Sequence, residues 1–162
     1  MRAPEPLNNK SPFAGFDCGK RSLNDWLISH ALQAQGSGSA RTFVVTENAN
    51  VLGYYSLVVG QVEPIEATDR IRKGLGQYPI PVMLLARLAV STHAQGQGIG
   101  TGLLQDAIRR TLNVAEQAGI RAMLTHPIDE SAGRFYQRFG FEASPLGQGQ
   151  LLLLLKDAKR LV

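Results

Sequence analysis

The chain has 162 residues, of which 44% are hydrophobic and 19% charged, and its net charge is +4. This composition argues against an intrinsically disordered chain, and the length predicts a single domain over residues 1–162. The sequence has no run of about 18 apolar residues and no apolar signal core, so we expect a cytoplasmic protein without a membrane partner. One cysteine, Cys18, and three scattered histidines offer neither an internal disulfide nor metal-ligand spacing, so no metal site is expected. Packing near the first helix is the role expected for Cys18.

In chain order, the first predicted element is a helix that begins at Ser22, with Asp25 three residues later as in a capping box, and ends before Gly36. Two strands follow over 41–46 and 51–62, joined by a turn as a hairpin. Residues 63–81 show no periodicity and contain several glycines and prolines. Such a segment is predicted to be a long loop that contacts a substrate.

The second half of the chain alternates strands and helices. The predicted elements are a strand over 82–90, a helix over about 100–117 ending at Gly119, a strand over 120–125, a helix over 129–139 with Asp129 as N-cap and Gly140 as stop, and a strand over 151–155. The strand over 82–90 is apolar on both faces apart from Arg87, as is typical of a central strand. The order predicts an α/β (α+β) fold with a mixed sheet and helices on both faces.

A glycine-rich turn, Gln95-Gly96-Gln97-Gly98-Ile99-Gly100, joins the central strand to the longest helix. Free N–H groups and the positive end of the helix dipole meet at such a point, which predicts a phosphate site. A Walker loop is excluded because the required lysine is missing, and a Rossmann turn is excluded because Thr101 and Leu103 stand where its last glycine belongs. A glycine turn without a ligand is the alternative at this point.

The spacing of Gln95, Gly98 and Gly100 resembles the pyrophosphate motif Gln/Arg-x-x-Gly-x-Gly/Ala of the GNAT family of N-acetyltransferases. A second block, Ala132–Phe141, is similar to the A-x-x-F-Y-x-x-x-G-F helix of that family. Two motifs in the same order are more specific than one, and the order of elements matches the family over nearly the whole chain. The resemblance implies the GNAT fold, with a mixed, mostly antiparallel central sheet, and acetyl-CoA as co-substrate.

The same resemblance implies which residues bind acetyl-CoA. The backbone of Leu88, Ala89 and Val90 would pair with the pantetheine arm, and main-chain donors would hold the pyrophosphate. These donors lie in the segment made of Gln95, Gly96, Gln97, Gly98, Ile99, Gly100 and Thr101. Phe135 is also expected near the cofactor and is expected to point to the core. Tyr136 would be the catalytic general acid, and a packed aromatic whose hydroxyl caps a backbone group is its alternative.

A narrower resemblance links the chain to the acetyltransferase toxins of bacterial type II toxin–antitoxin modules. It rests on five short blocks: Phe16–Gly19, Leu23–Leu27, Ser39–Thr42, Gly53–Leu57 and Leu84–Val90. The resemblance implies acetylation of the α-amino group of aminoacyl-tRNA, inhibition of translation and neutralisation by a ribbon-helix-helix antitoxin. It also implies a homodimer and operator DNA bound only through the antitoxin complex. The alternatives are acetylation of a small amine or a protein N-terminus, and a non-enzymatic acyl-CoA-binding module or co-repressor.

Five basic residues are candidates for contacts with tRNA: Arg41, Arg87, Arg70, Arg72 and Lys73. Arg41 and Arg87 lie in otherwise apolar strands, where an unpaired charge is costly. They would either meet RNA phosphates or form internal ion pairs. No strong protein base is expected, because an α-amino group with a pKa of about 7.7–8.0 is partly neutral in the cell. A tyrosine could protonate the departing thiolate.

Overall fold

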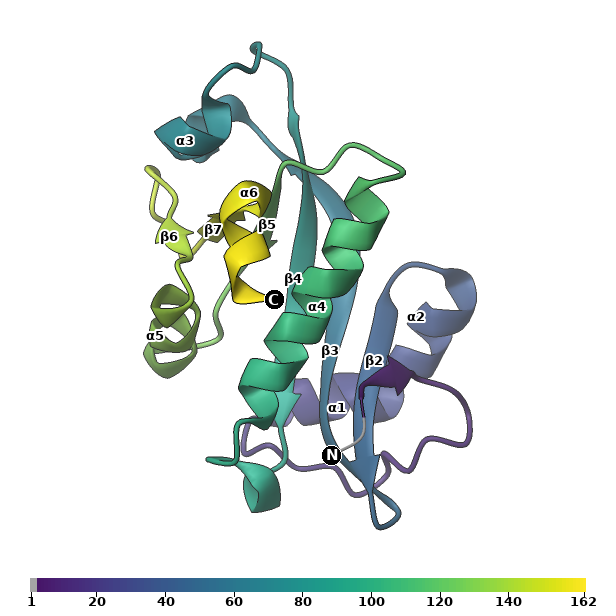
Figure 1. Cartoon of the computed structure of the whole chain (residues 1–162). Coiled ribbons are helices and arrows are strands. Elements are labelled where there is room, and N and C mark those ends of the chain that lie inside the picture. The colour runs from purple at the N-terminus through teal and green to yellow at the C-terminus, as the bar shows by residue number, and fades with distance from the viewer. Residues whose placement is uncertain (1–2) are drawn as a thin grey trace. The chain divides into compact units, whose positions relative to one another are not determined.

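The computed structural model describes residues 3–162 (Figure 1). Its strands are β1 (Glu5–Pro6), β2 (Arg41–Glu47), β3 (Asn50–Val62), β4 (Ile80–Val90), β5 (Ala122–Thr125), β6 (Glu142–Ala143) and β7 (Leu151–Leu154). They form one seven-stranded sheet in the order β1-β2-β3-β4-β5-β7-β6. The β4–β5 pair is parallel, whereas the pairs β1–β2, β2–β3, β5–β7 and β6–β7 are antiparallel. The predicted mixed, mostly antiparallel sheet is therefore confirmed.

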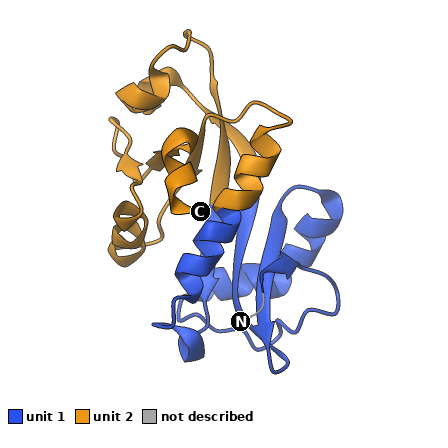
Figure 2. Ribbon diagram, in the orientation of Figure 1, with its two compact units in different colours: residues 1–58, 86–107 blue, residues 59–85, 108–162 orange. Residues whose placement is uncertain are grey.

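Helices and short 3₁₀ turns connect these strands. The helices are α1 (Arg21–Ser29), α2 (Ala31–Ser37), α3 (Asp69–Arg72), α4 (Ile99–Ala115), α5 (Glu130–Arg138) and α6 (Leu155–Ala158). The 3₁₀ turns cover Pro64–Glu66, Thr92–Ala94 and Lys159–Leu161. The chain divides into two compact units, which Figure 2 shows in blue and orange: unit 1 holds residues 1–58 and 86–107, and unit 2 holds residues 59–85 and 108–162. A single domain over residues 1–162 stays a prediction.

Within unit 1, helices lie on both faces of β3. Neighbouring residues of a strand point to opposite faces, so Gly53 and Tyr54 show what covers each face. A Cβ added at Gly53 would lie 2.9 Å from Leu103 Cδ1 of α4 and 3.0 Å from the carbonyl oxygen of Ala89, so a side chain here would force Leu103 to shift and would crowd this carbonyl. The next residue, Tyr54, is fully buried, and its ring stacks on Trp26 of α1 with centroids 6.2 Å apart. The long strand β3 is thus held between α4 and α1.

Each unit has a buried apolar cluster of its own. The cluster of unit 1 consists of Leu7, Phe16, Cys18, Leu27, Ala31, Val44, Val51, Tyr54 and Ala89. The cluster of unit 2 consists of Val62, Ala67, Ile71, Ile80, Val82, Ala122, Leu124, Leu152 and Leu154. The packing role expected for Cys18 is confirmed. β5 has strand partners on both edges, which explains why all its residues are buried.

The first helix differs from the prediction in its start and its continuity. α1 follows Lys20 without a side-chain cap, so capping by Ser22 is wrong. Asp25 instead lies 3.6 Å from the guanidinium of Arg21 one turn earlier. His30 leaves helical geometry (φ −126°, ψ −23°) and separates α1 from α2, which runs through Gly36 to Ser37. Gly38, with φ +78°, provides the left-handed C-cap.

Residues 63–81 are not the predicted long irregular loop. They contain a 3₁₀ turn and α3, and β4 already begins at Ile80. Side chains start both short elements: Glu63 and Glu66 form a capping box, and the Thr68 hydroxyl accepts a hydrogen bond from the Ile71 N–H at 3.4 Å. Elements of one turn are too short to show a helical period, which is why the sequence pattern missed them.

The ends of one helix and one strand also differ from the predicted ends. α4 ends at Ala115 and not at Gly119, because Gln117 and Ala118 both donate to the carbonyl of Val114 in a closing turn. The last strand ends at Leu154, because Leu155 begins α6. Apolar Leu155 is buried there as a helical residue, so the apolar run of the sequence spans the end of a strand and the start of a helix.

Candidate active site

The glycine turn of unit 1 joins the end of β4 to the N-terminus of α4. Gly96 (φ +80°) and Gly98 (φ +82°) are left-handed, a conformation that strains residues with a Cβ. No heavy atom lies within 4 Å of a Cβ built at either position, so the space beside this backbone is open. The two glycines are therefore required by the backbone conformation and not by packing.

The turn presents a row of unpaired donors. Among the hydrogen bonds of residues 3–162, none is donated by the backbone N–H groups of residues 96–101. The N–H of Gly102 is the first in α4 to be paired, at 3.1 Å from the carbonyl oxygen of Gly98. Consecutive free N–H groups at the positive end of a 17-residue helix suit a diphosphate. The residues present thus fit the pyrophosphate of acetyl-CoA.

The side chain of Gln95 holds the turn in place. Its Nε2 donates to the carbonyl oxygens of Val90 at 3.0 Å and Cys18 at 3.2 Å. The sequence motif named Gln95 but could not indicate these partners. Its side chain therefore fixes the geometry of the donors that follow it.

β4 extends beyond its partner strand. The last pair in the β4–β5 register is Leu85 with Thr125, where β5 ends, whereas β4 continues to Val90. Leu88 and Val90 are half-buried, and Ala89 is buried in the cluster of unit 1. The expected pantetheine-binding residues thus lie at the end of β4, beyond the last residue that pairs with β5.

Tyr136 lies on α5 in unit 2. The helix starts as predicted at Asp129, whose carboxylate accepts a hydrogen bond from the Ala132 N–H at 2.8 Å. Tyr136 is 5% exposed, and its ring centroid lies 5.4 Å from that of Phe141. Burial raises the pKa of the Tyr136 phenol to about 12, an effect that a side-chain hydrogen bond with Thr125 opposes.

Phe135 is only partly buried, with its ring 5.2 Å from the buried ring of Tyr136 and 5.2 Å from that of Phe139, between centroids. The guanidinium of Arg138 lies over the Phe135 ring at 5.9 Å from the centroid. Neighbouring residues of a helix point about 100° apart, so the face that buries Tyr136 leaves Phe135 at its border.

Arg41 and Arg87 have different surroundings within unit 1. Arg41 is exposed, and its Nη1 donates to the carbonyl oxygen of Gln35 at 2.8 Å. The Cζ of Arg87 lies 3.9 Å from the ring centroid of Trp26. In the described part of the chain neither guanidinium forms an ion pair, so the interpretation as internal ion pairs is wrong for both.

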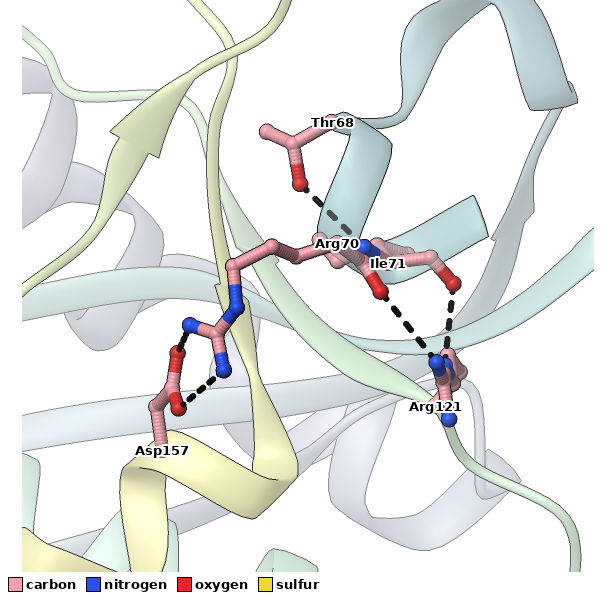
Figure 3. A network of polar contacts seen from close by, with 5 residues as sticks. All are labelled: Thr68, Arg70, Ile71, Arg121 and Asp157. Carbon is pink, nitrogen blue, oxygen red and sulfur yellow. Dashed lines mark hydrogen bonds and ion pairs between the residues drawn. The ribbon is translucent and has the colours of Figure 1, made fainter. Parts of the chain in front are cut away.

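Arg70, Arg72 and Lys73 belong to α3 and its C-cap in unit 2. Figure 3 shows the Arg70 guanidinium against the carboxylate of Asp157, with one nitrogen–oxygen distance of 2.9 Å. This ion pair lowers the pKa of Asp157. Arg72 pairs with Asp69 on the same helix, and the side chain of Lys73 is exposed. Two of these three candidates thus already hold a carboxylate.

Arg121, which the sequence did not single out, anchors α3. Its guanidinium donates to the carbonyl oxygens of Ile71 at 2.9 Å and of Arg70 and Lys73 at 3.2 Å each; Figure 3 shows the first two contacts. A cation at the C-terminal carbonyls of a helix also interacts favourably with the negative end of the helix dipole. Arg121 and α3 are about 50 residues apart in the sequence and meet only in the folded chain, so sequence spacing could not predict this contact.

Residues 3–162 contain no group of three or more His, Cys, Asp or Glu side chains that could hold a metal ion. Within the same range, no helix is both long and apolar enough to cross a membrane. The candidate residues for acetyl-CoA lie in both compact units. Residues 88–101 belong to unit 1, and Phe135 and Tyr136 belong to unit 2.

Residues 38–143 match the model of the acetyltransferase (GNAT) domain. A tRNA-acetylating toxin of Mycobacterium tuberculosis is 39% identical over 160 residues, covering 99% of this chain and 96% of the relative.

Two solved structures extend the likeness. AtaT in complex with acetyl-methionyl-tRNAfMet has a TM-score of 0.90 at 26% identity, covering 98% of each chain. A tyrosine-to-phenylalanine mutant of the AtaT toxin, bound to the C-terminus of the antitoxin AtaR and to acetyl-CoA, has a TM-score of 0.83 at 26% identity, covering 98% of this chain and 96% of that one.

Proposed function

Because this chain belongs to the GNAT family of acetyltransferases and is similar over its length to tRNA-acetylating toxins, we propose that it acetylates the α-amino group of aminoacyl-tRNA and thereby inhibits translation. The observation that carries the proposal is the row of unpaired N–H groups over residues 96–101, which supplies a diphosphate site where this family uses acetyl-CoA.

Different residues of the chain would bind different parts of acetyl-CoA. The N–H groups of residues 96–101 bind the pyrophosphate, and the end of β4 over Leu88–Val90 pairs with the pantetheine arm as an added strand would. An N–H of this segment polarises the acetyl carbonyl. When bound, acetyl-CoA supplies an acetyl group activated as a thioester. Phe135 of α5 is the further residue that the family resemblance assigns to acetyl-CoA.

Tyr136 acts as the general acid. Its hydroxyl is protonated at neutral pH, and burial, which raises its pKa to about 12, keeps it protonated into the alkaline range. The leaving thiol has an ordinary pKa of about 8.5, so it is a stronger acid than this phenol. The phenol therefore stabilises the departing thiolate by donating a hydrogen bond, and the proton passes fully to sulfur only where the closed site raises the pKa of the thiol as well. The attacking α-amino group is partly neutral near pH 7.7–8.0, so no strong protein base is needed.

The proposal includes the partners of a toxin. A ribbon-helix-helix antitoxin neutralises the enzyme, and operator DNA is bound through the complex of the two, as the structures of AtaT with AtaR and of the AtaT–AtaR complex with DNA suggest by similarity. The enzyme acts as a homodimer in the cytoplasm. Among the candidate cations, Arg41, Arg87 and Lys73 contact the RNA, whereas Arg70 and Arg72 would have to share their guanidinium groups with the carboxylates that they already hold.

An assay with labelled acetyl-CoA tests the proposal. Total charged tRNA is the acceptor, and the same tRNA after deacylation is the control. We expect label on the charged tRNA alone. Equal labelling of both preparations, or of neither, would overturn the proposal, and labelling of a small amine or a peptide N-terminus instead would assign the alternative acceptor.

A further inference from the structure

Arg87 differs from the chain's other candidate arginines in what its guanidinium contacts. Arg41 donates to a backbone carbonyl, and Arg70 pairs with a carboxylate. In the described residues the side chain of Arg87 makes neither a hydrogen bond nor an ion pair, and its contact is the face of Trp26. The N–H donors at the edge of this guanidinium are therefore free to bind a ligand.

Trp26 is itself held firmly. Its ring lies nearly parallel to that of Tyr54, at an interplanar angle of 12°. Tyr54 is fixed in turn, because its hydroxyl donates to the carbonyl oxygen of Leu23 at 2.7 Å and the edge of Phe16 packs against its ring at 5.5 Å between centroids. The result is a rigid aromatic platform under one cation.

Arg87 combines partial burial with uncovered hydrogen-bond donors. The residue is half-buried, and burial lowers its pKa, although the guanidinium remains charged at neutral pH. Taking a charge out of water without an acceptor costs free energy that a cation–π contact offsets only in part. A guanidinium with free edge donors presents a fork that matches the two oxygens of a phosphodiester.

The place of Arg87 on β4 restricts which phosphate it could bind. Alternate residues of a strand share a face, so Arg87 lies on the same face as Ala89, in the strand segment proposed for the pantetheine arm. At about 3.3 Å per residue, Arg87 is within roughly 10 Å of Val90 along the strand. In an aminoacyl-tRNA, the phosphate nearest to the amino acid links the last two nucleotides.

We propose that Trp26 is a positioning residue that holds the Arg87 guanidinium for bidentate hydrogen bonding to the phosphodiester before the terminal adenosine of aminoacyl-tRNA. The inference rests on the proposed function and adds to it the group of the RNA that the acceptor site recognises. A lysine would not replace Arg87, because an ammonium group offers neither the planar fork nor the same stacking on Trp26.

Two minimal acceptors test the proposal once the wild-type enzyme has shown which amino acid it acetylates. One is the aminoacyl ester of adenosine, which has no phosphodiester, and the other is the same ester of the dinucleotide cytidylyl-adenosine, which has one. The measured quantity is the preference, the ratio of kcat/KM for the dinucleotide to that for adenosine. We expect a wild-type preference of about tenfold or more.

Arg87→Gln and Arg87→Lys should remove most of this preference, and Trp26→Leu should reduce it severalfold while Trp26→Phe retains much of it. Arg21→Gln is the matched control, because it removes the same charge from an exposed position on α1 and should leave the preference unchanged. Thermal unfolding and the KM for acetyl-CoA, measured for each variant, identify any loss of fold.

The outcomes separate the two proposals. If the wild-type enzyme acetylates neither charged tRNA nor either ester, the proposed function fails. If it acetylates tRNA but shows no preference for the dinucleotide, or if Arg87→Gln lowers both rates equally, the phosphodiester contact is overturned. An unchanged preference in Trp26→Leu would overturn the positioning role. Should Trp26→Leu fail to fold, the comparison of Trp26→Phe with wild type and of Arg87→Lys with Arg87→Gln decides.

Discussion

The burial of Tyr136 determines the protonation state of its hydroxyl. A phenol that is 5% exposed, with a pKa of about 12, gives up its proton to solvent only in strong alkali. Within the site it can still donate to a developing thiolate, because both groups would share the same low-dielectric surroundings. The raised pKa therefore supports the proposed role of Tyr136 as an acid and argues against a role as a base.

Substitution of Tyr136 by Phe should remove the proton donor and keep the ring. We expect unchanged folding and acetyl-CoA affinity, because the aromatic contacts remain, and a fall in kcat of about 100-fold or more. Single-turnover kinetics and calorimetric titration with acetyl-CoA measure the two effects. Full activity in this variant would remove Tyr136 from the mechanism.

The pH profile provides an independent check at the same residue. The rate should rise as the substrate amine loses its proton near pH 8 and then stay level to about pH 10, because the raised pKa keeps Tyr136 protonated. A tyrosine of ordinary pKa, 10, would give a falling limb in that range. A fall in kcat/KM between pH 9 and pH 10, in enzyme that stays folded, would contradict the assignment.

At the scale of elements, the glycine turn and the start of α4 are together the proposed site for the pyrophosphate. Gly98→Ala should strain the left-handed backbone at φ +82° and misplace the free N–H groups. We expect the Kd for acetyl-CoA to rise about tenfold, since the strain is about 1–2 kcal/mol. Gly102→Ala is the matched control: no heavy atom lies near its Cβ position, and its backbone is helical. Equal affinities of both variants would disprove the turn's role.

Arg121 connects another pair of elements, the start of β5 and α3. Arg121→Ala would remove three hydrogen bonds to carbonyls of α3 and leave these oxygens without their partner. We expect the free energy of unfolding to fall by about 1–3 kcal/mol, with faster amide exchange over residues 69–75. Arg109→Ala, at an exposed position, should change the unfolding free energy by less than about 0.5 kcal/mol. Slow exchange over α3 in Arg121→Ala would contradict the anchoring role.

The elements that sequence patterns predicted are those long enough to show a period. The apolar stripe of α4, the β2–β3 hairpin and the Asp129 cap of α5 follow from local spacing, and so does the glycine turn between β4 and α4. The one-turn helices α3 and α6 carry no such signal. Contacts between distant segments, such as Arg87 on Trp26 and Arg121 on α3, depend on how the strands align and cannot be predicted from spacing.

At the scale of the whole molecule, the net charge of +4 is spread over arginines with unequal freedom to bind RNA. Arg70 and Arg72 are already paired with carboxylates, whereas Arg87 has no such partner in the described residues. Net charge alone is therefore a poor guide to the acceptor. The similarity to tRNA-acetylating toxins and the free donors of residues 96–101 together carry the account of donor and acceptor.

The central claim is the transfer of acetyl from acetyl-CoA to the α-amino group of an aminoacyl-tRNA. The most direct test identifies the atom that receives the label. Charged tRNA is reacted with labelled acetyl-CoA, the ester bond is then hydrolysed in mild base, and the RNA and the released amino acid are separated and analysed by mass spectrometry. The account predicts that the label leaves with the amino acid as its N-acetyl derivative. Label that stays on the RNA would contradict it.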